Sequence, residues 1–153
     1  MASISLNNAA ALTERSKRTW QRRVDDGLAR RGEDDSCARA TVDLTDVVPL
    51  IAIAMNTDDL ERVAAADAGD PEAQNDVALL FLAAGRYEAA VYWLALAAKQ
   101  EYGDAMHHLG RCHLAGTGVP RDEHLAIMWI AKAAAKGHTI ARQQIFALKQ
   151  GAL

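Results

Sequence analysis

The sequence predicts a mainly α-helical protein, with an N-terminal helix-turn-helix unit that could carry a small β wing, followed by an α-solenoid of antiparallel helix pairs. Three observations predict this fold class. The C-terminal half repeats itself, its apolar side chains recur every three or four residues as on one helix face, and the first 31 residues are far more basic than the rest. Half of the 153 residues are apolar, which is enough for one core or two small ones.

The N-terminal unit is assigned to residues 1–56. Its first 31 residues hold seven basic and three acidic side chains, a net charge of +4, whereas the whole chain carries −3. Ser16 can cap a helix in which Trp20 and Val24, four residues apart, face inward, and Gly27 ends that helix. A β-like ATVDL segment and a short apolar helix from about residue 45 follow. A basic segment of this kind is suited to a polyanion.

This order of elements resembles the winged helix-turn-helix of excisionase and MerR-type proteins, in which a helix beginning near SKRT enters the DNA major groove. The matching residues are Ser16, Thr19, Arg22, Val24 and Gly27. The resemblance implies that the outer face of the helix binds DNA through Lys17, Arg18, Gln21 and Arg22. Three departures are Glu14 in place of the turn glycine, Arg15 in place of the usual apolar turn residue, and acidic residues 33–35 where a wing would approach phosphates. The alternative interpretation is a small helical cap with a solvated basic face.

A helical-repeat domain is predicted for residues 57–153. Thr57 to Asp59 provide a helix N-cap, and the LERVAAADAGD that follows is alanine-rich like a second repeat helix, so we interpret residues 57–69 as a capping half-repeat. Two full repeats are assigned to residues 70–103 and 104–139. A third copy begins near residue 140 and ends after one helix, which gives a terminal helix at 140–153.

The repeat is read from the alignment of the chain with itself. VYWLALAAKQ from Val91 aligns with IMWIAKAAAK from Ile127 at an offset of 36, which places Trp93 over Trp129. Upstream, Ala73 aligns with Ala105 at an offset of 32, so the second inter-helix loop has gained four residues. We expect the two tryptophans to be equivalent buried plugs between alanine-rich helices, because small residues let helices approach closely.

The helix boundaries of the first repeat have their own signals. Asp70 supplies an N-cap, Pro71 follows at the first helical position, and Gly85 ends the helix. The second helix runs from about Tyr87 to Gln100. A single pair of this kind cannot bury its apolar face alone, so neighbouring pairs must stack.

The second repeat resembles the Sel1-like repeat, a relative of the tetratricopeptide repeat. The matching residues are Leu109-Gly110, Gly116, Gly118-Val119-Pro120, Asp122, Ala126, Trp129, Lys132-Ala133-Ala134, Gly137 and Ala141. The first repeat lacks the GxGVP loop and has AAGRYEAA instead. The resemblance implies a superhelical scaffold whose first helices line a concave surface for a protein partner. We predict that this surface includes Asn75, Leu79, His107 and Arg111.

Other kinds of site are not predicted. His108 and Cys112 have metal-ligand spacing on one helix, but positions 109, 110 and 112 are packing positions that the histidines flank, so neither a metal nor a cofactor is expected. The glycines of the Gly116 to Pro120 loop serve a turn rather than a phosphate cradle, since no GK[ST] follows. No apolar run approaches the length of a membrane span, and no secretory signal is present. Two cysteines far apart in sequence suit the cytoplasm.

Two functions remain open at this point. The first is a cytoplasmic regulator whose N-terminal unit binds double-stranded DNA and whose repeats bind a protein. The second is a protein-protein adaptor that does not bind DNA. An enzyme is not predicted, because the sequence has no paired nucleophile and base, carboxylate dyad or cofactor fingerprint. The sequence does not indicate an oligomeric state.

Overall fold

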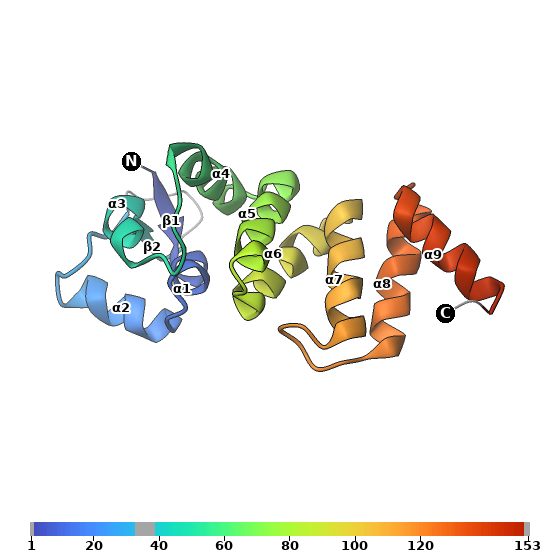
Figure 1. Ribbon diagram of the computed structural model, residues 1–153. Coiled ribbons are helices and arrows are strands. Elements are labelled where there is room, and N and C mark those ends of the chain that lie inside the picture. Colours follow the sequence, from blue (N-terminus) through green and yellow to red (C-terminus); the bar gives the residue numbers. More distant parts are fainter. Residues whose placement is uncertain (1, 33–38, 152–153) are drawn as a thin grey trace. The chain divides into compact units, whose positions relative to one another are not determined.

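The structure is a computed structural model that describes residues 2–32 and 39–151. The chain divides into two compact units, one ending at Ala68 and one beginning at Gly69. Figure 1 labels the elements of both units. The described part is mainly helical, as the sequence predicts, with a two-stranded sheet near the N-terminus.

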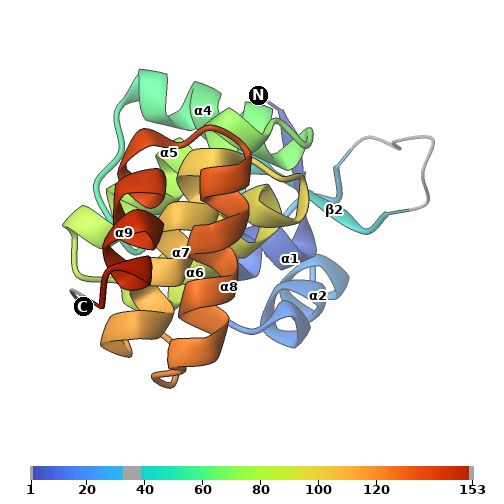
Figure 2. The ribbon, with the colours of Figure 1, turned by 90° about the vertical axis from the view of Figure 1, so that its right-hand side faces the viewer.

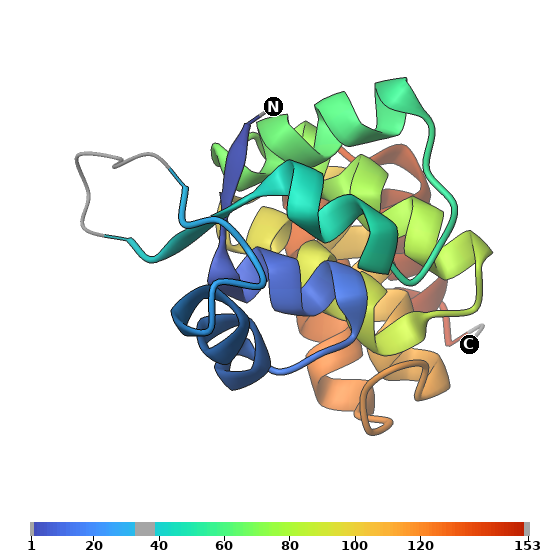
Figure 3. The same cartoon turned by 90° about the vertical axis from the view of Figure 1, so that its left-hand side faces the viewer.

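The N-terminal unit contains two short helices joined by a turn, next to a small sheet (Figure 3). Strands β1 (Ser3–Ser5) and β2 (Thr41–Asp43) pair antiparallel, with Ile4 opposite Val42. Helix α1 (Leu6–Thr13) is joined by a short turn to α2 (Lys17–Asp25). The α2 cap is the predicted one, because the Ser16 Oγ accepts a hydrogen bond of 3.0 Å from the Thr19 N–H. Glu14, which stands where the family pattern has glycine, adopts a left-handed φ of 52°.

The core of this unit is centred on Trp20, whose side chain is fully buried. Its indole N–H donates to the Thr13 Oγ1 at 2.9 Å, which ties α2 to the end of α1. Val24, predicted to face inward with Trp20, is only half-buried. The other large side chains of this core are Ile4, Leu6, Leu12, Val42, Leu44, Val47 and Val63.

The elements that follow β2 complete the N-terminal unit. They are α3 (Leu44–Val47), the 3₁₀ helix η1 (Val48–Leu50) and α4 (Thr57–Asp67). The Asp67 carboxylate, at the end of α4, accepts hydrogen bonds from the Ser5 N–H at 2.9 Å and the Asn8 Nδ2 at 2.6 Å. The boundary between units therefore lies after Ala68 rather than after residue 56, because α4 is held by polar contacts within the N-terminal unit.

The C-terminal unit is a series of helices that pack in sequence order (Figure 1). It consists of α5 (Pro71–Ala83), α6 (Tyr87–Lys99), α7 (Gly103–Ala115), α8 (Glu123–Ala135) and α9 (Thr139–Lys149). Figure 2 shows α7, α8 and α9 side by side. The Asp70 Oδ1 caps α5 by accepting from the Glu72 N–H at 3.0 Å, and Pro71 occupies the first helical position. Gly85, with φ +74°, follows the end of α5 as predicted.

The two tryptophans of the repeats are not equally buried. Trp93 on α6 is fully buried, whereas Trp129 on α8 is only partly buried and has the Lys132 Nζ 5.1 Å from its ring centroid. The repeat register is the predicted one. The prediction that both tryptophans are equally buried between the helices is wrong. The remaining core of the unit comprises Val77, Ala78, Phe81, Ala89, Ala90, Leu94, Ala97, Ala105, Met106, Leu109, Ala126, Ile130, Ala133 and Ala141.

Candidate protein-binding surface

The first helices of the two repeats, α5 and α7, share a set of buried packing positions. Ala73 and Ala105 are equivalent and both are buried, as are Val77 and Leu109. A further equivalent pair is Ala78 and Gly110, again buried in both helices. Because these positions keep small or apolar side chains, each first helix is held by the same face in both repeats.

Gly110 shows how closely α7 and α8 approach. A Cβ at this position would lie 2.7 Å from the Ile130 Cγ1 and 3.0 Å from the Ala126 carbonyl oxygen. No larger residue fits without moving one of these neighbours. The contact fixes the rotation of α7 about its axis, and with it the direction of the side chains on its opposite face.

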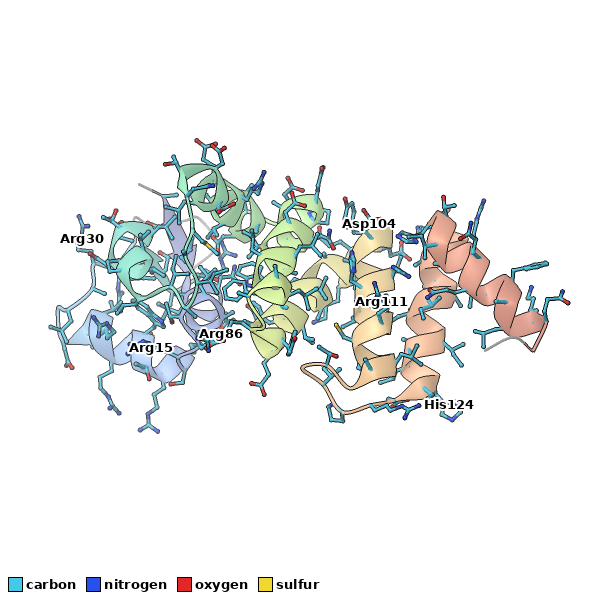
Figure 4. The ribbon with its side chains drawn as sticks, in the orientation of Figure 1. Arg15, Arg30, Arg86, Asp104, Arg111 and His124 are labelled. Atoms are coloured by element: carbon cyan, nitrogen blue, oxygen red, sulfur yellow. The ribbon has the colours of Figure 1, made fainter. Side chains whose placement is uncertain are left out.

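Two positions outside the packing face of the first helices differ in chemistry from one repeat to the next. Leu79 on α5 is half-buried, and its equivalent on α7 is the exposed Arg111. One turn earlier, Asp76 is equivalent to His108, and both are half-buried. Figure 4 shows Arg111 on α7, with Asp104 two turns nearer the start of the helix. The first helices therefore share three packing positions and differ at two positions outside them, while the exposed pair of Glu72 and Asp104 is acidic in both repeats.

Two of the four predicted groove residues lie in the interior. Asn75 is 3% exposed, and its side-chain oxygen has no hydrogen-bond partner among the described residues. His107 is likewise 3% exposed, and its Nε2 lies 2.9 Å from the Gln144 Oε1 of α9. Leu79 and Arg111 remain at the surface. The first-helix surface is therefore defined here as Glu72, Asp76 and Leu79 on α5, with Asp104, His108 and Arg111 on α7.

Burial and neighbouring charge alter the titration of the α7 side chains. Burial lowers the pKa of His107, the hydrogen bond with Gln144 raises it, and nearby His138 and Arg111 lower it again. Burial also lowers the pKa of His108, with further lowering by His107 and Arg111. Near neutral pH both rings are therefore held in the uncharged form. Burial raises the pKa of the Cys112 thiol, so it is held in the unreactive protonated form.

The N-terminal unit presents most of its predicted DNA-binding residues to solvent. Lys17, Arg18 and Arg22 are exposed on α2. Gln21 is half-buried, and its Nε2 donates to the Asp25 Oδ1 at 2.9 Å. The acidic residues 33–35, which weigh against DNA binding in the sequence, lie outside the described residues.

The described part of the chain holds neither a metal cluster nor a membrane helix. Within residues 2–32 and 39–151, no group of three or more His, Cys, Asp or Glu side chains is arranged to bind a metal ion. Among the helices described, none is long and apolar enough to cross a membrane.

The repeat unit is thus an α-solenoid of stacked helix pairs, and the comparisons with known proteins define its class. The Sel1 repeat matches residues 71–102 and 103–138, which correspond to the α5–α6 and α7–α8 pairs. The chain therefore contains two Sel1 repeats, as the sequence predicts. Sel1 repeat proteins are protein-protein interaction scaffolds.

Solved structures with the same fold support this assignment. A Sel1 repeat protein from Oxalobacter formigenes is 33% identical with a TM-score of 0.54, over 58% of this chain and 27% of that one. The protein c5321, a protective antigen present in uropathogenic Escherichia coli strains and displaying an SLR fold, is 26% identical with a TM-score of 0.57. That match covers 61% of this chain and 21% of c5321. The chain thus spans about a quarter of these relatives. A search of curated proteins gave no match.

The residues that bury His107 were not predicted from the sequence. They are His138, which precedes α9, and Gln144, which lies on it. A signal for His138 exists in the repeat alignment, because extending the third copy upstream places His138 at the position of the N-cap residue Asp70. For Gln144 we find no local signal, since its contact depends on the packing of α9 against α7.

Proposed function

We propose that this protein is a non-enzymatic adaptor of the cytoplasm whose repeat unit binds a protein partner through the first-helix surface. One observation carries the proposal: α5 and α7 both keep small or apolar residues at three buried packing positions, whereas Asp76 and Leu79 on α5 are replaced by His108 and Arg111 on α7. A rigid repeated backbone with a varied outer face is how solenoids present binding determinants.

The centre of this surface is Arg111. It is exposed, it has no ion pair among the described residues, and it lies near the half-buried His108 ring. A guanidinium offers several donors in a fixed plane and is well suited to a partner carboxylate. Leu79, at the equivalent position of the preceding repeat, adds apolar area. The surface also carries three carboxylates, so it is suited to a peptide segment with an apolar side chain and charges of both signs.

Site-specific photocrosslinking tests this proposal and identifies the partner in the same experiment. A benzophenone amino acid at Arg111 should give a discrete adduct in the native cells, which mass spectrometry would identify. The matched control is the same amino acid at His124, an exposed residue in the first turn of α8 (Figure 4). Adducts formed from His124 and not from Arg111 would place the binding surface on the second helices instead.

Once the adduct is identified, the charge of Arg111 can be tested directly. We expect Arg111→Glu to weaken binding of the purified partner by about tenfold or more, which corresponds to about 1.4 kcal/mol. The free energy of unfolding should change by less than about 0.5 kcal/mol, because the side chain is exposed. Unchanged affinity in isothermal titration calorimetry would remove Arg111 from the interface.

DNA binding by the N-terminal unit is the second candidate function. The observation that favours it is the pair of helices α1 and α2, whose arrangement resembles a helix-turn-helix, with the Ser16 cap and three cations exposed on α2. In such a motif the second helix is the one that enters the major groove. Lys17, Arg18 and Arg22 would then face phosphates or base edges.

A salt series with duplex DNA tests this candidate. If Arg18 and Arg22 each contact one phosphate, the Arg18→Ala/Arg22→Ala variant should reduce the slope of log affinity against log salt by about 2. Arg121→Ala/Lys149→Ala is the control, because it removes two exposed cations from the repeat unit. Equal effects of the two variants, or no DNA affinity in the parent, would leave the adaptor without a DNA-binding function.

A further inference from the structure

Helix α9 begins at an unusual cap. His138, the residue before α9, accepts a hydrogen bond at its Nδ1 from the Ala141 N–H, at 3.1 Å. Its Nε2 lies 3.1 Å from the Asp104 Oδ1 on α7. Both contacts are satisfied by one neutral tautomer, in which Nδ1 has a free lone pair and the Nε2–H donates to the carboxylate. A protonated ring would direct a second N–H at the Ala141 N–H and lose the cap.

His107 adds a second contact between α7 and α9. Its ring stacks on the His138 ring with 4.4 Å between centroids and 25° between planes. Its Nε2 lies 2.9 Å from the Gln144 Oε1, in the second turn of α9. Since His107 is almost fully buried, a charge on it would have little access to water. The junction of α7 and α9 is therefore built from two stacked imidazoles that fit together when neutral.

We propose that His107 and His138 form a pH-sensitive latch, which holds α9 against α7 while both rings are neutral and releases α9 when the rings are protonated. The latch would act on the repeat unit as a whole, because α9 also packs against α8. Its release would remove the last helix from the stack and expose the side of α7 that carries His107.

The charges around His107 disfavour a positive charge on its ring. Burial lowers the pKa of His107 most, and nearby His138 and Arg111 lower it further, while the hydrogen bond with Gln144 and the more weakly acting Asp104 raise it. The His108 ring is a further neighbour on α7. Lys136, after α8, is paired with Glu101 at 3.1 Å. On α9, the Arg142 Nε donates to the Ala134 carbonyl oxygen at 3.2 Å. A charged His107 would therefore be buried against the neutral Gln144 rather than against a carboxylate.

The direction of the pH dependence follows from His107. Its pKa in the docked state is lowered, by burial first, from the ordinary value of 6.5. The released state therefore binds more protons over the interval between the two pKa values. Docking is at full strength above about pH 6.5 and weakens as the pH falls from there toward the docked-state pKa. Each proton taken up on release can shift the docking equilibrium by up to about tenfold per pH unit.

NMR of the full chain tests the latch. Between pH 7.5 and pH 5.0, the Cα shifts of residues 139–149 should move from helical toward unstructured values, while those of α5 remain helical. The ring signals of His107 and His138 should titrate with the same midpoint as the α9 shifts. A protein in which both rings become protonated while α9 keeps its helical shifts would overturn the proposal.

A non-titrating latch provides the matched variant. In His107→Gln/His138→Asn, the asparagine keeps a capping side chain and the glutamine keeps a hydrogen-bonding group, and neither ionises in this range. We expect this variant to keep α9 helical from pH 7.5 to pH 5.0, while His124→Gln, on α8, behaves like the parent. A pH response as large as that of the parent would refute the latch. If the double variant fails to dock α9 at pH 7.5, the parent titration alone decides, through the shared or separate midpoints of the rings and the helix.

Discussion

Replacing Trp93 with alanine is expected to lower the free energy of unfolding by about 3–5 kcal/mol, the usual cost of removing a large buried aromatic side chain. Trp93 is fully buried on α6, among alanines that cannot move in to fill the space it would leave. A loss of this size is a large share of the ~5–15 kcal/mol that stabilises a typical protein. Urea denaturation followed by circular dichroism would measure it.

Two further variants test whether the lost volume of the Trp93 side chain causes the loss of stability. The indole Nε1 of Trp93 is buried without a hydrogen-bond partner among the described residues, so Trp93→Phe should cost less than alanine substitution. Trp129→Ala should cost only about 1–2 kcal/mol, because a ring that is already partly in water loses less by removal. Equal losses for Trp93→Ala and Trp129→Ala would mean that the two rings are equally buried in solution.

The repeat architecture could be predicted because its signals are local. The offset between Trp93 and Trp129 fixes the repeat register, and the Asp70-Pro71 cap and Gly85 fix the limits of one helix. The caps depend only on residues within a few turns of each other, and the register is read by aligning the chain with itself. The N-terminal unit was less predictable. Helix α4 is held in it by hydrogen bonds that the Asp67 carboxylate accepts from residues about sixty positions away.

The first-helix surface was predicted with an error of one residue. Asn75 and His107 are buried, whereas their neighbours Asp76 and His108 are half-exposed. One residue corresponds to about 100° of rotation around a helix axis. Periodicity identifies the apolar face, but the exact rotation depends on contacts with other helices, such as that of Gly110 with α8. Arg111 is exposed and lies about 100° around the axis of α7 from Gly110.

The second large effect is expected at Gly118, in the loop between α7 and α8. Gly118 has a φ of +73°, and a Cβ there would lie 2.5 Å from the Tyr87 carbonyl oxygen and 2.7 Å from its carbon. We expect Gly118→Ala to lower the free energy of unfolding by about 2–5 kcal/mol, from left-handed backbone strain of ~1–2 kcal/mol and overpacking of ~1–3 kcal/mol. The reason is that this loop packs directly on the first residue of α6, and so joins one repeat to the other.

Gly85→Ala separates the two contributions to that loss. Gly85 has nearly the same φ, +74°, but a Cβ there would meet nothing within 4 Å. This variant should therefore show the backbone strain alone, about 1–2 kcal/mol. The difference between the two variants in urea denaturation then measures the contact between Gly118 and Tyr87. If both variants lose the same stability, the loop does not pack on α6 in solution, and the two repeats are joined only through the packing of α6 against α7.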